Sequence, residues 1–137
     1  IGTQIKRFMD TGAFIVNAGI DNAKVKEALR LIMVEIAKLK RNLVTESEFE
    51  RAKEFYLGQL MLALEDTLDH MLWIGESTAA LDKVYSYDQI AQHVKRLKRS
   101  DIKEAARKIF RQDNLNLALI SPFKDMEESV YKELRIN

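Results

Sequence analysis

The sequence contains no cysteine, one proline and two histidines in 137 residues. The lack of cysteine excludes a disulfide framework, thiolate catalysis and Cys-ligated zinc. No apolar run approaches the about 20 residues of a membrane-spanning helix, and the start of the chain has none of the regions of a signal peptide. Lysine plus arginine (22) nearly balance aspartate plus glutamate (21), which leaves a net charge of +1. We therefore expect a soluble protein without affinity for nucleic acid or membranes. The sequence does not identify the compartment, although the cytoplasm is favoured.

Two β-rich segments open the chain. Ile1, Thr3 and Ile5 alternate with polar residues, the period-2 pattern of a half-buried strand. A turn containing Gly12, which can take a positive φ, follows, and the run 13–20 is again β-rich. The pattern predicts an antiparallel hairpin. Because the chain begins in the middle of a strand pattern, we also expect a truncated domain.

Helical periodicity dominates the remainder. A first helix is expected from the capping residue Asp21 or Asn22 to about residue 40. Its expected apolar stripe consists of Val25, Leu29, Ile32, Ile36 and Leu39, and the cations Lys38, Lys40 and Arg41 suit the negative end of the helix dipole. A second helix is predicted to open at a capping box formed by Thr45 and Glu48. No proline interrupts it, and its end or kink is expected at residue 75, a glycine.

Shorter elements follow. An S-x-x-Q box at Ser86 and Gln89 predicts a helix, Ser100 is expected to cap another, and 126–134 is predicted to form a last helix. Leucines alternate over 114–121 before Pro122, which predicts a late strand. The predicted fold is α+β: an antiparallel sheet, made of the hairpin plus the late strand, covered on one face by several helices. Residues 1–137 are expected to form one truncated domain.

Neither histidine is expected to bind a metal. His70 follows Glu65 and Asp66 at helical spacing, but a zinc peptidase site needs two helical histidines beside a glutamate, and His70 has no such partner. We therefore expect His70 to be structural or solvent-exposed, and His93 likewise. The sequence predicts no catalytic, cofactor-binding or metal-binding residue in this chain.

Three other patterns admit a functional interpretation. The basic run 93–99 is interpreted as a solvated helix end, because no aromatic residue is interleaved with it. Serines lack a G-x-S-x-G elbow, which leaves Ser-His-Asp chemistry without support. One set of aromatic and methionine side chains with helical spacing could line a peptide groove, but we expect it to be core. Its members are Phe49, Phe55, Tyr56, Trp73, Met61 and Met71.

In order and spacing, several segments resemble the C-terminal domain of the insulinase/pitrilysin zinc peptidases. They are the hairpin turn 10–14 (DTGAF), the helix opening 45–53 (T-x-x-E-F-E-R-A-K), 64–66, 87–90, 100–102 and the stretch 110–122, which ends in N-L-x-L-A-L-I-S-P. The resemblance runs from about residue 10 to residue 122.

The resemblance implies two similar α/β halves that close around a peptide chamber. Zinc would be held by an H-x-x-E-H motif in the N-terminal half, and this chain has no such motif. An Arg and a Tyr that hold substrate in the family would precede Ile1, and neither Arg7 nor Tyr56 matches them. The chain is thus expected to be a non-catalytic domain of a zinc metallopeptidase, with the N-terminal half and the peptide substrate as partners.

Two alternatives remain open at this stage. The chain can belong to an inactive family member that serves as a scaffold or partner subunit, or it can be a free-standing helical interaction module. A further expectation concerns assembly. The first predicted strand has a free edge, and Lys6 and Arg7 are the only charged residues that would disfavour pairing along it. Pairing of this strand with the same strand of a second copy would give a homodimer.

Overall fold

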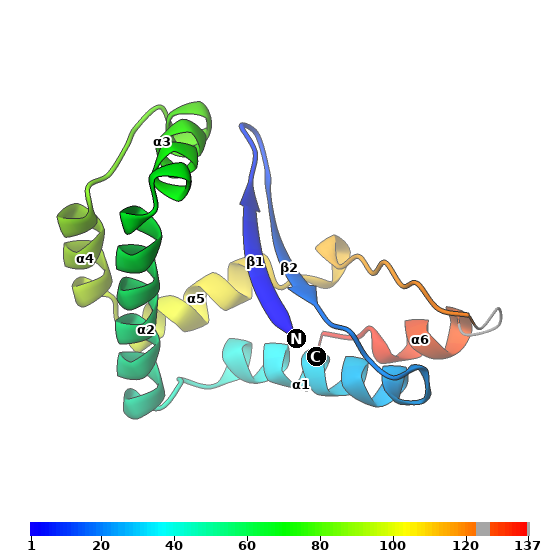
Figure 1. Cartoon of the computed structure of the whole chain (residues 1–137). Helices are drawn as coiled ribbons and strands as arrows, with labels where there is room; N and C mark the ends of the chain where they lie inside the picture. The colour runs from blue at the N-terminus through cyan, green and yellow to red at the C-terminus, as the bar shows by residue number, and fades with distance from the viewer. Residues whose placement is uncertain (123–126, 137) are drawn as a thin grey trace. The chain divides into compact units, whose positions relative to one another are not determined.

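The computed structural model describes residues 1–122 and 127–136 and confirms an α+β fold (Figure 1). The elements are β1 (Gly2–Arg7), β2 (Gly12–Asn17), η1 (Asn22–Lys24), α1 (Val25–Arg41), α2 (Glu46–Glu65), α3 (Thr67–Leu81), α4 (Tyr87–Arg96), α5 (Arg99–Ile109), η2 (Gln112–Asn114) and α6 (Glu127–Glu133). Two compact units divide the chain. The first comprises Ile1–Gly2, Val16–Leu43 and Ser100–Asn137, and the second Thr3–Ile15 and Val44–Arg99.

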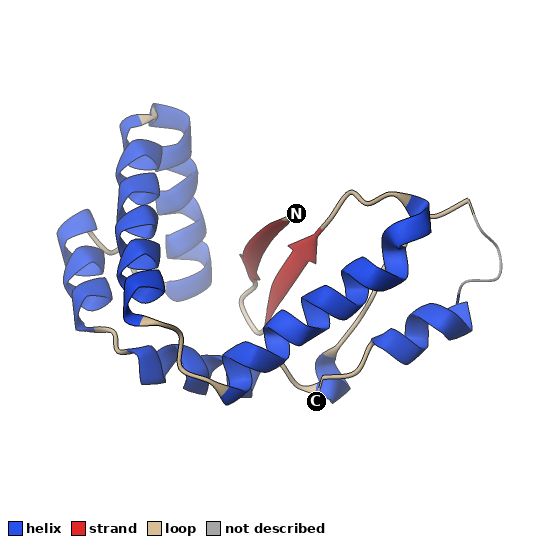
Figure 2. Cartoon of the chain, turned by 90° about the horizontal axis from the view of Figure 1, so that it is seen from below, coloured by secondary structure: helices blue, strands red, loops and turns tan. Residues whose placement is uncertain are grey.

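The predicted hairpin is confirmed. Strands β1 and β2 pair with each other, and Figure 2 shows them as the red arrows. The Phe8 N–H donates to the Thr11 carbonyl at 2.9 Å and closes the turn. Gly12 does not use its ability to take a positive φ. Glycine fits there for a different reason, because a Cβ would lie 3.2 Å from the carbonyl oxygen of Lys6.

In the first unit, α1 packs against α6. The small core between them contains Val25, Leu29 and Val130, with Leu134 packed against it. The predicted start of the helical segment is confirmed, since the Asp21 carboxylate accepts from the Ala23 N–H at 2.8 Å. This cap opens η1, which leads directly into α1.

Side-chain hydrogen bonds hold other segments of this unit together. The side-chain amide of Gln112 donates to the Leu134 carbonyl at 2.9 Å and accepts from the Ile136 N–H at 2.8 Å. The Nε of Arg107, on α5, donates to the carbonyl of Lys40 at 3.1 Å, near the end of α1. Residues far apart in the sequence are thereby joined without a large apolar core.

In the second unit, α2 contacts both α3 and α4 (Figure 1). The predicted start of α2 is confirmed, because Thr45 Oγ1 accepts from the Glu48 N–H at 3.3 Å. The capping box is only half formed: the Glu48 carboxylate accepts from the Thr45 hydroxyl, at 3.5 Å, instead of from the Thr45 N–H. Phe49, the residue after Glu48, is buried.

The predicted helix end at Gly75 was wrong. The chain leaves helical geometry at Asp66 (φ −77°, ψ 127°), and Gly75 lies inside α3. The Asp66 carboxylate accepts from the N–H groups of Leu68 and Asp69 at 2.9 and 3.0 Å, so it caps a new helix. Two satisfied backbone donors outweigh the small cost of a glycine inside a helix.

Of the predicted starts of α4 and α5, the structure confirms the first and contradicts the second. The box at Ser86 and Gln89 is confirmed in both directions, with bonds of 2.9 and 3.3 Å. The expectation that Ser100 caps α5 was wrong, because α5 begins at Arg99 and Ser100 lies within its first turn.

The predicted late strand at 114–121 was wrong. Gln112–Asn114 is a 3-10 turn, and within residues 1–122 and 127–136 the sheet consists of β1 and β2 alone. A strand requires a hydrogen-bonded neighbour, and leucine alternation alone does not provide one. The last helix is confirmed as α6, and its predicted first residue, Met126, lies outside the described residues. Within the described residues, none of the helices combines the length and the hydropathy of a membrane-spanning segment.

Candidate functional site

Both histidines are exposed on helices of the second unit. His70 lies on α3 with its ring 6.1 Å from that of Trp73. His93 lies on α4, where Nδ1 is 2.7 Å from the Gln89 carbonyl oxygen and the ring meets Tyr85 edge-on. Among the described residues, no group of three or more His, Asp or Glu side chains is placed to hold a metal ion. Of the two positions expected for the histidines, structural or solvent-exposed, the structure shows the exposed one.

The basic run 93–99 is only partly a solvated helix end. Lys95 and Arg96 are exposed at the end of α4, as expected of a solvated helix end. Arg99 instead reaches the start of α2, where its Nε lies 3.1 Å from Glu46 Oε2 and its Nη1 donates to the Val44 carbonyl at 3.1 Å. This arginine therefore has a structural role.

The aromatic and methionine set is only partly core. Phe49 is 6% exposed, with the Lys53 ammonium 4.9 Å from its ring centre, and Trp73 is half-buried. The core prediction was wrong for the other four members, which are exposed: Phe55, Tyr56, Met61 and Met71. The helical spacing of these residues was the reason for predicting that they are buried. In the structure, no other described element packs over their side chains.

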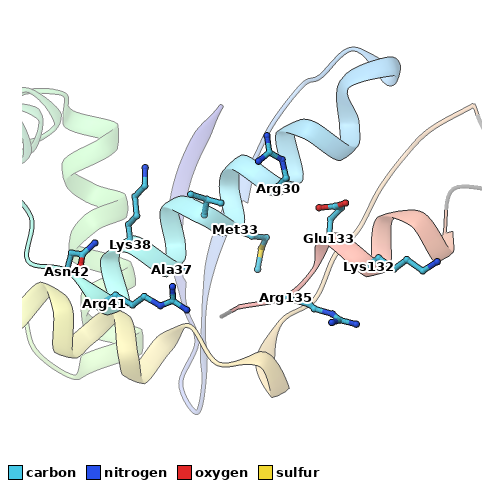
Figure 3. Close-up of a pocket in the computed structure, with 10 residues that line it drawn as sticks. Arg30, Met33, Ala37, Lys38, Arg41, Asn42, Lys132, Glu133 and Arg135 are labelled. Carbon is cyan, nitrogen blue, oxygen red and sulfur yellow. The ribbon is translucent and has the colours of Figure 1, made fainter.

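The described structure has a surface pocket of about 350 Å³ in the first unit, between α1 and the α6 region (Figure 3). The side contributed by α1 consists of Arg30, Met33, Val34, Ala37, Lys38 and Arg41, followed by Asn42. These residues recur at intervals of three and four, so one face of the helix lines the pocket. The opposite side is formed by Lys132 and Glu133 of α6 and by Arg135 just after it.

The pocket has an apolar base and a cationic margin. Met33 is 6% exposed and Ala37 is half-buried, whereas Arg30, Arg41 and Arg135 are exposed. Five of the ten lining residues are cationic and one is anionic. The ammonium of Lys38 is additionally paired with Glu35, at 2.6 Å, in an exposed i, i+3 ion pair.

Sequence reasoning missed this pocket. The lysines and arginines at the end of α1 were interpreted only as partners of the helix dipole. The available signal was the position of Arg30, Lys38 and Arg41 along a single helical face. Nothing local indicated that α6, about 90 residues later, supplies the other wall.

Comparisons with known proteins agree on one family. The family model described as the peptidase M16 inactive domain matches residues 1–56, which include the hairpin, α1 and the first half of α2. The chain is 31% identical over 119 residues to YmxG of Bacillus subtilis, an uncharacterized zinc protease, covering 87% of this chain and 29% of that protein.

Two further relatives extend the comparison. An uncharacterized zinc protease of Streptomyces coelicolor is 29% identical over 122 residues, covering 89% of this chain and 26% of that protein. The mitochondrial-processing peptidase subunit alpha-2 of Dictyostelium discoideum is 26% identical over 129 residues, covering 93% of this chain and 28% of that protein. The chain thus spans less than a third of the length of these relatives.

Proposed function

The chain belongs to the insulinase-type (M16) peptidase family, within its C-terminal, inactive domain, and on that premise we propose that it contributes one wall of a peptide-enclosing chamber in a zinc metallopeptidase. The observation that carries the proposal is the match of the inactive-domain model to residues 1–56. The names of two relatives as zinc proteases support the reaction class.

The described residues do not fit a zinc site. Histidines 70 and 93 lie on different helices, and no carboxylate cluster joins either of them in the described part of the chain. Zinc requires three or four ligands at fixed positions. We therefore assign the metal, and the activation of the attacking water, to an N-terminal half that carries the H-x-x-E-H motif.

The proposed partner is that N-terminal half, together with the peptide that the two halves enclose. Support comes from the exposed apolar side chains of α2 and α3, among them Phe55 at 68% and Met71 at 59% exposure. Isolated globular proteins seldom leave so many large apolar side chains uncovered. The relatives are more than three times as long as the matched segment. In a protein of similar length, other parts of the chain would be able to cover these apolar side chains.

Self-association through the hairpin is a second proposed contact. Every residue of β1 is exposed, and β1 has one described strand neighbour. Two such strands can pair antiparallel around a two-fold axis.

Photo-crosslinking in the full-length protein tests the chamber proposal. The glutamate of its H-x-x-E-H motif is replaced by glutamine to stop turnover, and a peptide substrate carrying benzoylphenylalanine is bound and irradiated. We expect crosslinks to residues within 1–137 that an excess of unlabelled peptide abolishes. Crosslinks confined to the N-terminal half would contradict the proposal.

A second candidate, an inactive partner subunit, is favoured by the relative named as a subunit of a processing peptidase. The parent sequence distinguishes the active peptidase from the inactive subunit. An H-x-x-E-H motif upstream supports the active peptidase, because a two-half protein that lacks this motif cannot hold the catalytic zinc through it. An initiator methionine immediately before Ile1 would support instead the free-standing interaction module.

A further inference from the structure

The pocket between α1 and α6 concentrates positive charge in a chain that is almost neutral. Its ten lining residues include five cations and one carboxylate, whereas the whole chain carries a net charge of +1. The residues outside the pocket are therefore net negative. The helix dipoles account for Lys38 and Arg41 in the last turn of α1 and for Lys132 in the last turn of α6. They do not account for Arg30, which lies nearer the middle of α1, or for Arg135, which follows α6.

The size of the pocket favours a small molecule. Its volume of about 350 Å³ lies at the lower end of the range for small-molecule sites. The base is apolar and includes Met33 and Ala37 from one face of α1 (Figure 3). Val34 of the same helix also lines the pocket and is 40% exposed. A bare inorganic ion would leave this apolar surface uncovered, whereas a ligand with a hydrocarbon segment would bury it.

The cations are also spread along the helix. Arg30 and Arg41 are eleven residues apart, which at 1.5 Å per residue corresponds to about 16 Å along the axis. A single carboxylate or phosphate cannot reach both. A ligand with two negative groups separated by several carbon atoms can contact two of the cations at once. The long side chains of the arginines span the part of the distance that the ligand itself does not cover.

We propose that this pocket binds an organic bis-anion, a small molecule with one anionic group, a carboxylate or a phosphate, at each end of an apolar segment. The apolar segment lies on Met33 and Val34, and the charged ends pair with guanidinium and ammonium groups on the α1 and α6 sides. Glu133 is the lining residue that opposes such a ligand, because it brings a negative charge to the pocket. The site is independent of the peptidase proposal, since it lies wholly within residues of the first unit.

Calorimetric titration of the 137-residue chain tests the inference. The probes are suberate, 1,6-hexanediol bisphosphate, inorganic phosphate and the neutral 1,8-octanediol. We expect saturable binding of suberate or of the bisphosphate, about tenfold tighter than inorganic phosphate, and no saturation with octanediol. The bisphosphate carries up to about twice the charge of suberate, so a difference between these two probes reports charge as well as end group. Raising the ionic strength from about 0.01 to 0.15 M should weaken the binding.

Substitutions then locate the ligand. Arg30→Gln and Arg41→Gln should each weaken binding by about three- to tenfold, while Arg96→Gln, an exposed arginine of α4 in the other unit, should leave it unchanged. Glu133→Gln should tighten binding by about threefold, a gain that loss of folding cannot imitate. Thermal unfolding of each variant separates lost binding from lost structure.

Three results would overturn the proposal. They are inorganic phosphate binding as tightly as suberate and the bisphosphate, no saturable binding of either of these two organic probes, and equal affinity in the parent chain and Glu133→Gln. Failure of the peptide crosslinking described above would leave this titration unaffected, so the two proposals are tested separately.

Discussion

Arg99 binds Glu46 through a 3.1 Å contact between Nε and Oε2, and its Nη1 donates to the neighbouring Val44 carbonyl at 3.1 Å. Residues separated by more than 50 positions are joined by one planar guanidinium. The Glu46 carboxylate stands in the first turn of α2, where the helix dipole also favours negative charge. Arg99 therefore positions the start of α2 within the second unit.

Arg99→Ala should lower the free energy of unfolding by about 1 kcal/mol, because a partly exposed ion pair and one charge-assisted hydrogen bond are lost together. Arg99→Lys should recover less than half of this loss, since a single ammonium cannot reproduce the two-pronged geometry. Arg96→Ala is the matched control at an exposed position of the same basic run. Urea denaturation measures all three, and equal midpoints for Arg99→Ala and Arg96→Ala would refute the role assigned to Arg99.

Thr45→Ala should cost about 1 kcal/mol because the Glu48 N–H loses its side-chain acceptor. Glu48→Ala should cost less, since the reciprocal bond of the box is not formed in the structure. Ser47→Ala serves as a control within the first turn of α2. Chemical denaturation gives the ranking, and a larger loss in Glu48→Ala than in Thr45→Ala would contradict the observed cap.

Gly58→Ala and Gly75→Ala should each stabilise the chain by about 0.5–1 kcal/mol. Both glycines lie inside helices, neither has a positive φ, and an added Cβ meets no atom within 4 Å. Alanine therefore removes backbone entropy from the unfolded chain without creating a clash. Thermal unfolding provides the test. Destabilisation by Gly75→Ala would indicate that this residue is a kink, as the sequence pattern had predicted.

The exposed hairpin edge predicts concentration-dependent association of the isolated chain. Ile5, in β1, is 62% exposed, and Ile5→Lys should shift a dimer toward monomer by placing additional charge on the strand. Leu72→Lys, at a 49% exposed position of α3, is the control for general loss of apolar surface. Light scattering at about millimolar concentration gives the masses. A parent chain that is wholly monomeric there would count against strand pairing.

Local signals in the sequence predicted the elements whose cause is local. The hairpin turn, the Asp21 cap and the box at Ser86 and Gln89 each depend on residues within four positions of one another. The helix break at Asp66 was not predicted although its side chain is a good cap, because the apolar periodicity continues across it into α3. The helix could end either at Asp66 or at Gly75. It ends at Asp66, because the Asp66 carboxylate accepts two backbone hydrogen bonds there, whereas Gly75 offers only backbone flexibility.

Features that depend on distant partners were not predictable in the same way. The alternating leucines over 114–121 indicate which side chains would share one face of a strand, but they do not indicate a neighbouring strand to pair with. In the structure this segment forms no strand. Met33 was absent from the predicted apolar stripe and is nevertheless buried. The cationic pocket requires α1 and α6 to meet, a contact between segments about 90 residues apart that no local pattern encodes.

Zinc stoichiometry, measured by atomic spectroscopy after exhaustive dialysis, tests the central claim most directly. The two samples are the full-length protein that contains this sequence and the isolated 137-residue chain. The account predicts about one zinc ion per full-length chain and none retained by the isolated chain, because catalytic zinc needs three protein ligands that the described residues do not bring together. Stoichiometric zinc in the isolated chain, or a full-length protein that binds none, would contradict it.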